Sequence, residues 1–251
     1  MRKSLGRGDV AVNVGANIGY HALLMASCVQ DSGQVFAYEP NPRAHQLLRR
    51  SLCWGGLLGT TTLFPFAAGD RRGTARFLVN REFLGGGSFY EWTPDLAWLH
   101  LPAYAHLHEA DLRAVKEAFR LEAKPIDVHV ATLDETVERC VPEIHLLLMD
   151  AQQAEPLVLE GGRDLIARSR DLTIVMEWGY GEKLVPDAGQ RARARTAIER
   201  LAADGFEFRE IRGDARDIYA RPAILVPMDV EDVMATDRFV DIFARRRGTA
   251  A

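Results

Sequence analysis

The chain has 251 residues, a formal net charge of −4 and 47% hydrophobic residues. This length fits two small domains or one large α/β domain, and the repeated strand-then-helix pattern favours a single domain over residues 1–251. The acidic balance gives no general attraction to nucleic acid, and no apolar run approaches the ~18 residues that cross a bilayer. We therefore expect a soluble protein, without a membrane span or a nucleic-acid partner, that acts on small molecules.

The N-terminus and the cysteines indicate the compartment. Residues 1–3 are basic, but the apolar stretch after them contains Asn13 and a glycine turn and lacks a cleavage-site pattern, so we expect no secretion signal. Cys28, Cys53 and Cys140 are an odd number without metal-ligand spacing, which suits a reducing compartment. These features predict a cytoplasmic location.

The first element of the chain is typical of a nucleotide-binding start. Residues 10–14 predict a buried strand, residues 15–19 a tight turn and residues 20–26 the opening of a helix. Small residues let a ligand approach the backbone, and the free N–H groups of the helix start point to the same place. Gly15 and Gly19 lack the G-x-G-x-x-G spacing of a pyrophosphate site, which disfavours an NAD(P)-dependent oxidoreductase.

The second strand ends in a carboxylate. Residues 34–39 form an apolar run that ends at Glu39, about 20 residues after the glycine turn, where a ribose diol would be bound. Asn41 is a good N-cap and Pro42 suits the first helical position, so we predict a helix over residues 43–52. A ligand with a ribose but without a pyrophosphate fits both motifs, and S-adenosylmethionine is such a ligand.

The rest of the chain predicts the elements of a doubly wound sheet. We expect strands at 60–67, 73–79, 144–150, 172–177, 206–211 and 223–226, and helices at 155–167, at 190–204 and from 230 to the basic C-terminal end. Residues 128–134 predict a strand that leads to a helix capped by Thr132 or Asp134. The predicted fold class is α/β: a Rossmann-like, doubly wound, mostly parallel sheet with helices on both faces, an antiparallel closing strand and a helical insertion.

Residues 89–125 fit no step of a plain doubly wound sheet. They are rich in aromatic residues and are either a lid over the site or a subunit contact, which leaves a homo-oligomer open. His100, His106 and His108 lie in this insertion. Because no matching cysteine or carboxylate pattern accompanies them, we predict no metal.

Together these motifs resemble the FkbM-type family of S-adenosylmethionine-dependent methyltransferases. The resemblance runs from about residue 8 to residue 178 and rests on residues 14–20, 39–42, 132–134 and 150–155. It implies a class I methyltransferase fold, S-adenosylmethionine as cofactor, and transfer of a methyl group to a hydroxyl of a small molecule or sugar. The residues expected to bind the cofactor are Asn13, Gly15, Ala16, Asn17, Gly19, Tyr20, Glu39, Pro40, Ala68 and Asp150.

Two further acids stand at predicted strand ends. Ligands of open α/β sheets lie beyond the carboxyl ends of the strands, and Asp150 and Glu177 fall there, as Glu39 does. A base is needed only if the acceptor carries a proton. We expect Asp150 to be that base, with N-capping of the next helix as its alternative role, and Glu177 to be the second candidate. His145 is better explained as a satisfied core histidine, and Asp70 as a turn residue.

Three residues depart from the family's pattern. Asn13 stands where an Asp is usual, and Gln152 and Gln153 stand where Glu and Gly are usual. The loss of a charge should weaken cofactor binding, and Gln153 restricts a tight turn. Family members also often carry extra sequence before the first strand. A non-catalytic binding or scaffold protein on the same fold is therefore the alternative hypothesis.

Overall fold

A computed structural model describes residues 4–80, 87–89, 123–137, 139–212 and 224–246. The described elements, in chain order, are β1 (Val10–Val14), α1 (Tyr20–Val29), η1 (Gln30–Ser32), β2 (Gln34–Tyr38), α2 (Pro42–Trp54), η2 (Leu58–Thr60), β3 (Thr61–Phe64), β4 (Ala67–Ala68), β5 (Gly73–Asn80), β6 (Ala123–Ala131), α4 (Leu133–Thr136), β7 (Leu146–Met149), α5 (Glu155–Gly161), α6 (Arg163–Arg168), β8 (Thr173–Trp178), α7 (Ala188–Ala203), β9 (Phe206–Arg212), β10 (Ile224–Met228), α8 (Val230–Met234) and β11 (Val240–Arg246). In this part of the chain no helix is long and apolar enough to cross a membrane.

The main sheet has eight strands in the order β10-β9-β11-β8-β7-β1-β2-β3. The run from β3 to β8 is parallel throughout. Strand β11 is antiparallel to both β8 and β9, and β10 is antiparallel to β9. The predicted α/β fold with a mostly parallel sheet and an antiparallel closing end is confirmed. Because β2, β1, β7 and β8 run the same way, their carboxyl ends meet at one edge.

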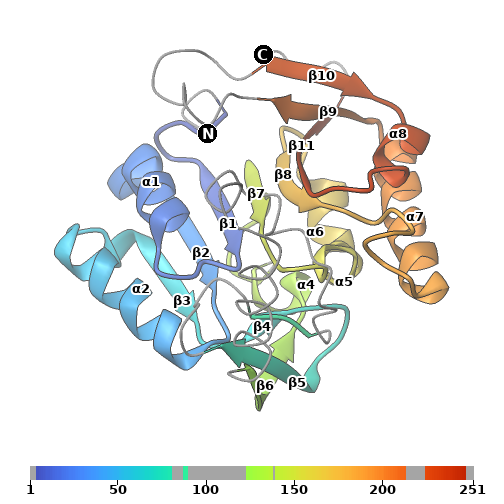
Figure 1. Cartoon of the computed structure of the whole chain (residues 1–251). Helices are drawn as coiled ribbons and strands as arrows, with labels where there is room; N and C mark the ends of the chain where they lie inside the picture. The colour runs from blue at the N-terminus through green and yellow to red at the C-terminus, as the bar shows by residue number, and fades with distance from the viewer. Residues whose placement is uncertain (1–3, 81–86, 90–122, 138, 213–223, 247–251) are drawn as a thin grey trace, which may run out of the picture.

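Helices cover the sheet from both sides (Figure 1). Ala11, Leu146 and Leu148 pack with the apolar residues of α1 on one face, which we call the α1 face. Val12 and Leu147 belong to the large cluster on the opposite face, to which α5, α6 and α7 contribute. Since successive side chains of a strand point to opposite faces, the doubly apolar central strands are explained by burial on both sides.

A second sheet, of order β4-β6-β5, lies below the first in Figure 1. The predicted strand 60–67 is wrong as one element, because β3 stops at Phe64 and Ala67–Ala68 pair with β6 instead. Pro65 separates the two parts and has no N–H to continue a ladder. Strand β6 begins at Ala123, before the predicted start at residue 128, and pairs with β5 from Ala123 to Val130. Residues 90–122 of the expected insertion lie outside the described residues.

Two other predictions need correction. The predicted helix 155–167 is two helices, α5 and α6, joined at Gly161 and Gly162; a Cβ on Gly161 would lie 1.9 Å from the Gly69 carbonyl oxygen. The predicted C-terminal helix is wrong beyond Met234, because β11 fills the place between β8 and β9. Its alternate residues from Val240 onward are buried, which is the period of a strand.

The helix caps follow the sequence closely. The Asn41 side chain accepts a hydrogen bond from Arg43 N at 3.0 Å and caps α2, with Pro42 in the first position. Thr132 caps α4 in a capping box with Glu135. The turn after α7 uses Gly205 at φ +85°, a conformation that favours glycine and ends the helix.

Candidate active site

The glycine turn after β1 is held against the end of β7. Gly15 has φ +74°, and a Cβ there would lie 2.0 Å from the Asp150 carbonyl oxygen. Gly19 has φ +102° and faces Leu48 of α2, and Asn17 is left-handed at φ +48°. Gly15 and Gly19 each combine a positive φ with too little room for a Cβ atom, and only glycine meets both requirements. The turn therefore brings the start of α1 over the carboxyl ends of β1 and β7.

Glu39 lies directly after β2 and is fixed by the backbone. One carboxylate oxygen accepts from Asn17 N and the other from Asn41 N, each at 2.8 Å. The side chain is 6% exposed, and burial raises its pKa to about 7 against the opposing effect of the two N–H donors. Each oxygen keeps a second lone pair, so the carboxylate can accept two further hydroxyl hydrogen bonds.

A cavity of about 550 Å³, part of it open to solvent, lies beside Glu39. The predicted binding residues that line it are Gly15, Asn17, Glu39, Pro40, Ala68 and Asp150. Phe77 and Phe89 form an apolar part of the wall with ring centroids 5.4 Å apart; Phe77 is not among the predicted site residues, and Phe89 is the first residue of the predicted insertion. The second sheet thus closes the cavity from below.

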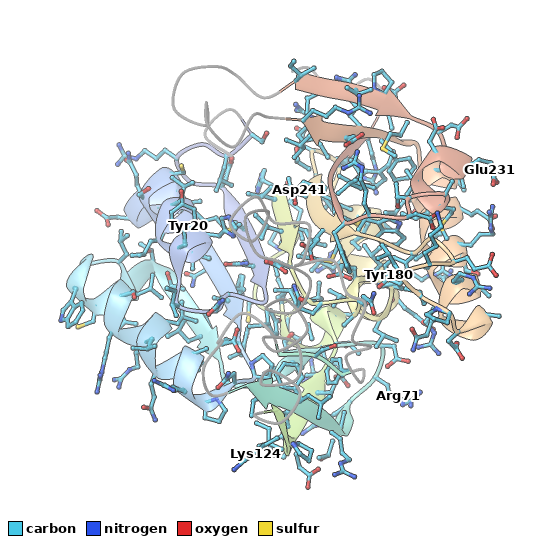
Figure 2. The ribbon with its side chains drawn as sticks, in the orientation of Figure 1. Tyr20, Arg71, Lys124, Tyr180, Glu231 and Asp241 are labelled. Atoms are coloured by element: carbon cyan, nitrogen blue, oxygen red, sulfur yellow. The ribbon has the colours of Figure 1, made fainter. Side chains whose placement is uncertain are left out.

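Four predicted cofactor-binding residues lie outside this lining, among them Tyr20 at the start of α1, which Figure 2 labels, and Glu177, the second catalytic candidate, also lies outside it. Ala16 is buried behind the turn, Gly19 packs on α2, and Tyr20 is 73% exposed with its ring edge against His21. Asn13 is fully buried on the α1 face, and neither atom of its amide has a hydrogen-bond partner. Asn13 therefore belongs to the strand beneath the turn instead of to the cavity wall.

Three carboxyl groups form a row across adjacent strands on the α1 face. Glu177 of β8 pairs directly with Asp241 of β11, and Asp150 follows Met149, whose partner is Met176. Asp150 is thus level with Glu177 and shares its face. Burial, followed by the charges of Asp150, Glu155 and Asp241, raises the pKa of Glu177 to about 9. This raised pKa favours the protonated form of Glu177 at neutral pH.

The turn from Asp150 to α5 is unusual in its backbone. Gln152 and Gln153 are both left-handed, at φ +50° and +72°. The buried Glu155 accepts from Ala151 N at 2.7 Å, and Tyr180 OH donates to its other oxygen at 3.2 Å. The N-cap of α5 is Ala154, without a side-chain cap, so the predicted alternative of Asp150 as helix cap is wrong.

The remaining candidates lie away from the cavity. His145 Nδ1 accepts from Val10 N at 3.1 Å just before β7, at the edge opposite the site, as expected of a satisfied histidine. Asp70 forms ion pairs with Arg193 and Arg71. Among the described residues no group of three His, Cys, Asp or Glu side chains could hold a metal, and the insertion histidines lie outside them.

Comparison with known proteins gives one family. The model of the methyltransferase FkbM domain matches residues 13–194. The 2-O-methyltransferase NoeI of Sinorhizobium fredii (strain NBRC 101917 / NGR234) is 30% identical over 162 residues, which are 64% of this chain and 60% of the relative. The chain thus spans about three fifths of the length of this curated relative.

Solved structures of methyltransferases are similar at a greater distance. Methyltransferase FkbM from Methylobacillus flagellatus KT has a TM-score of 0.41 at 14% identity, covering 67% of this chain and 32% of that one. Aeropyrum pernix fibrillarin with bound S-adenosyl-L-methionine has a TM-score of 0.46 at 11% identity, covering 96% and 68%. These distant likenesses carry no functional assignment. The family model alone covers more than half of the sequence, and the chain belongs to the FkbM family of methyltransferases.

Proposed function

We propose that this protein transfers a methyl group from S-adenosylmethionine to a hydroxyl of a small molecule or sugar. The observation that carries the proposal is Glu39, a buried carboxylate with a spare lone pair on each oxygen, beside a cavity and a glycine turn that lacks pyrophosphate spacing. A relative named for 2-O-methylation supports a hydroxyl acceptor.

The residues present fit this cofactor. Glu39 would hold the ribose diol, the turn from Gly15 to Asn17 would lie along the ligand, and the wall at Ala68 and Phe77 would receive an apolar ring. When bound, the sulfonium supplies an activated methyl carbon. The protein's own work is then alignment, exclusion of water and removal of the acceptor's proton.

Asp150 is the group we propose as the base. It lines the cavity and is exposed, whereas the raised pKa of Glu177 favours a protonated form at neutral pH that is better suited to donate a hydrogen bond to the acceptor. Asp150→Asn keeps the shape of the side chain but takes no proton. We expect turnover to fall by roughly 10² to 10⁴ with affinity for S-adenosylhomocysteine little changed. Near-normal turnover would exclude Asp150 as the base.

The other hypotheses have less support. Membership of a methyltransferase family does not favour a non-catalytic scaffold, and the glycine spacing does not favour a nicotinamide enzyme. An acceptor screen with isotopically labelled methyl donor tests the proposal, and hydroxylated sugars are its first members. We also propose a cytoplasmic location, supported by the free thiols of Cys28, Cys53 and Cys140.

A further inference from the structure

Gln152 joins the two candidate catalytic carboxyls. Its Nε2 atom lies 2.8 Å from Asp150 Oδ1 and 3.2 Å from Glu177 Oε2, and it donates to both. An amide NH₂ group has two hydrogens, so one nitrogen can satisfy two acceptors at once. The side chain therefore ties the end of β7 to β8 at the edge of the cavity.

The backbone of Gln152 is held in place for this contact. A left-handed conformation is unfavourable for a residue with a side chain, so surrounding contacts must fix it. Ser88 Oγ donates to the Gln152 carbonyl oxygen at 3.1 Å, and Glu155 holds the preceding residue through Ala151 N. The turn is thus determined from both sides.

Gln152 places a hydrogen-bond donor within the row of carboxyls. In the part of the chain that the structure describes, Asp150, Glu177 and Asp241 form no ion pair with a Lys or Arg side chain. After burial, the charges of Asp150 and Asp241 contribute to the raised pKa of Glu177. An amide between two members of the row reduces this repulsion without adding charge.

We propose that Gln152 is a positioning residue of the transfer reaction, holding Asp150 by one oxygen and leaving Oδ2 free to receive the acceptor's proton. The inference rests on the proposed function. In this step the O–H bond of the acceptor breaks and its proton passes to Asp150. The electron pair left on that oxygen forms the new C–O bond to the methyl carbon, and the pair of the broken C–S bond stays with sulfur.

The two hydrogen bonds from Gln152 Nε2 can be tested without a catalytic assay. The hydrogen bond from Gln152 lowers the pKa of Glu177, so Gln152→Ala should raise it. Carbon-13 carboxyl titration by NMR measures this pKa in the full chain, with Glu177→Gln to assign the signal. Gln46→Glu, an added charge on the exposed side of α2, is the control and should leave it unchanged. An unmoved Glu177 pKa in Gln152→Ala would overturn the proposal.

The catalytic consequence is tested by the pH profile of Gln152→Glu. A carboxyl between Asp150 and Glu177 has a raised pKa; protonated it still donates one hydrogen bond, and ionised it repels both neighbours. Turnover should fall by on the order of 10²-fold at pH 8 and recover toward the parent's value as the pH is lowered, whereas Gln152→Ala stays low throughout. S-adenosylhomocysteine affinity should change little in either variant.

The outcomes separate the two proposals. A Gln152→Glu variant with the parent's pH profile would refute the positioning role while leaving the methyltransferase assignment intact. A parent protein that transfers no methyl group and binds no S-adenosylhomocysteine would refute the assignment. If turnover in both Gln152 variants fell only in proportion to their loss of thermal stability, Gln152 would have a structural role only.

Discussion

Glu39 shows how one residue makes cofactor binding depend on pH. In the free protein its pKa is raised to about 7 by burial, whereas the ribose hydroxyls need the ionised form as acceptor. Affinity for S-adenosylhomocysteine should therefore rise between pH 6 and 8, and binding near pH 7 should release a proton. Calorimetry in two buffers of different ionisation enthalpy measures that proton. A flat affinity without proton release would show that Glu39 is already ionised or is not used.

Gln153 carries strain that a glycine would relieve. Its φ of +72° costs the folded state roughly 1–2 kcal/mol, and its side-chain Nε2 atom is buried without a hydrogen-bond partner. Against this gain, glycine increases the conformational entropy of the unfolded chain, which lowers stability by about 0.5–1 kcal/mol. Gln153→Gly should therefore raise the melting temperature by on the order of 2 °C. A lower melting temperature would mean that the Gln153 side chain makes a stabilising contact, and differential scanning calorimetry decides.

The carboxyl row gives an element-level prediction about stability. The pKa of Glu177 is raised from its ordinary 4.5 to about 9, so its contribution to stability is fully present below pH 4.5 and is lost as the pH rises through 9. The Glu177→Gln variant avoids that loss of stability because its amide does not ionise. Its melting temperature relative to the parent should rise by on the order of 2–4 °C between pH 6 and 10. A constant difference across this range would contradict the assigned titration.

Strand β11 can be tested through its two faces. Ile242 is fully buried between β8 and β9, whereas Asp241 is exposed on the α1 face beside Glu177. Ile242→Ala should cost about 2–5 kcal/mol and lower the melting temperature by on the order of 5–15 °C. Asp241→Ala should not lower it, because it removes a like-charge neighbour. Equal changes in melting temperature at both positions would contradict the assignment of one buried and one exposed face to β11.

The sequence predicted the elements whose signals are local. The turn from Gly15 to Gly19, the position of Glu39 after β2 and the cap at Asn41 follow from apolar runs, glycines and capping residues. Asp241 was missed because its strand pairs with segments distant in sequence, and a short apolar alternation ending in arginines also fits a helix. The sequence marks Glu155 only as the start of a predicted helix, and the structure shows that its carboxylate accepts a hydrogen bond from Ala151 N in the preceding turn.

At the scale of the whole molecule, the site draws on segments from one end of the sequence to the other. The glycine turn and Glu39 form one side, Phe77 of β5 and Phe89 form an apolar part of the wall, and Asp150 brings one end of the carboxyl row to the cavity. The C-terminal strands lie beyond residues 13–194 that match the family model, yet β11 contributes Asp241 to the row. Variation in that part of the chain would therefore alter the acceptor side without disturbing the ribose site.

Binding of S-adenosylhomocysteine tests the central claim most directly. Two hydrogen bonds from ribose hydroxyls to a carboxylate are worth ~1.5–3 kcal/mol each, so Glu39→Ala should weaken binding by roughly 10²- to 10⁴-fold. Glu39→Gln, which retains an acceptor for one backbone N–H, controls for loss of the turn and should fold like the parent. The account predicts calorimetric binding by the parent and its marked weakening in both variants. No heat and no thermal shift with the parent at millimolar S-adenosylhomocysteine would contradict it.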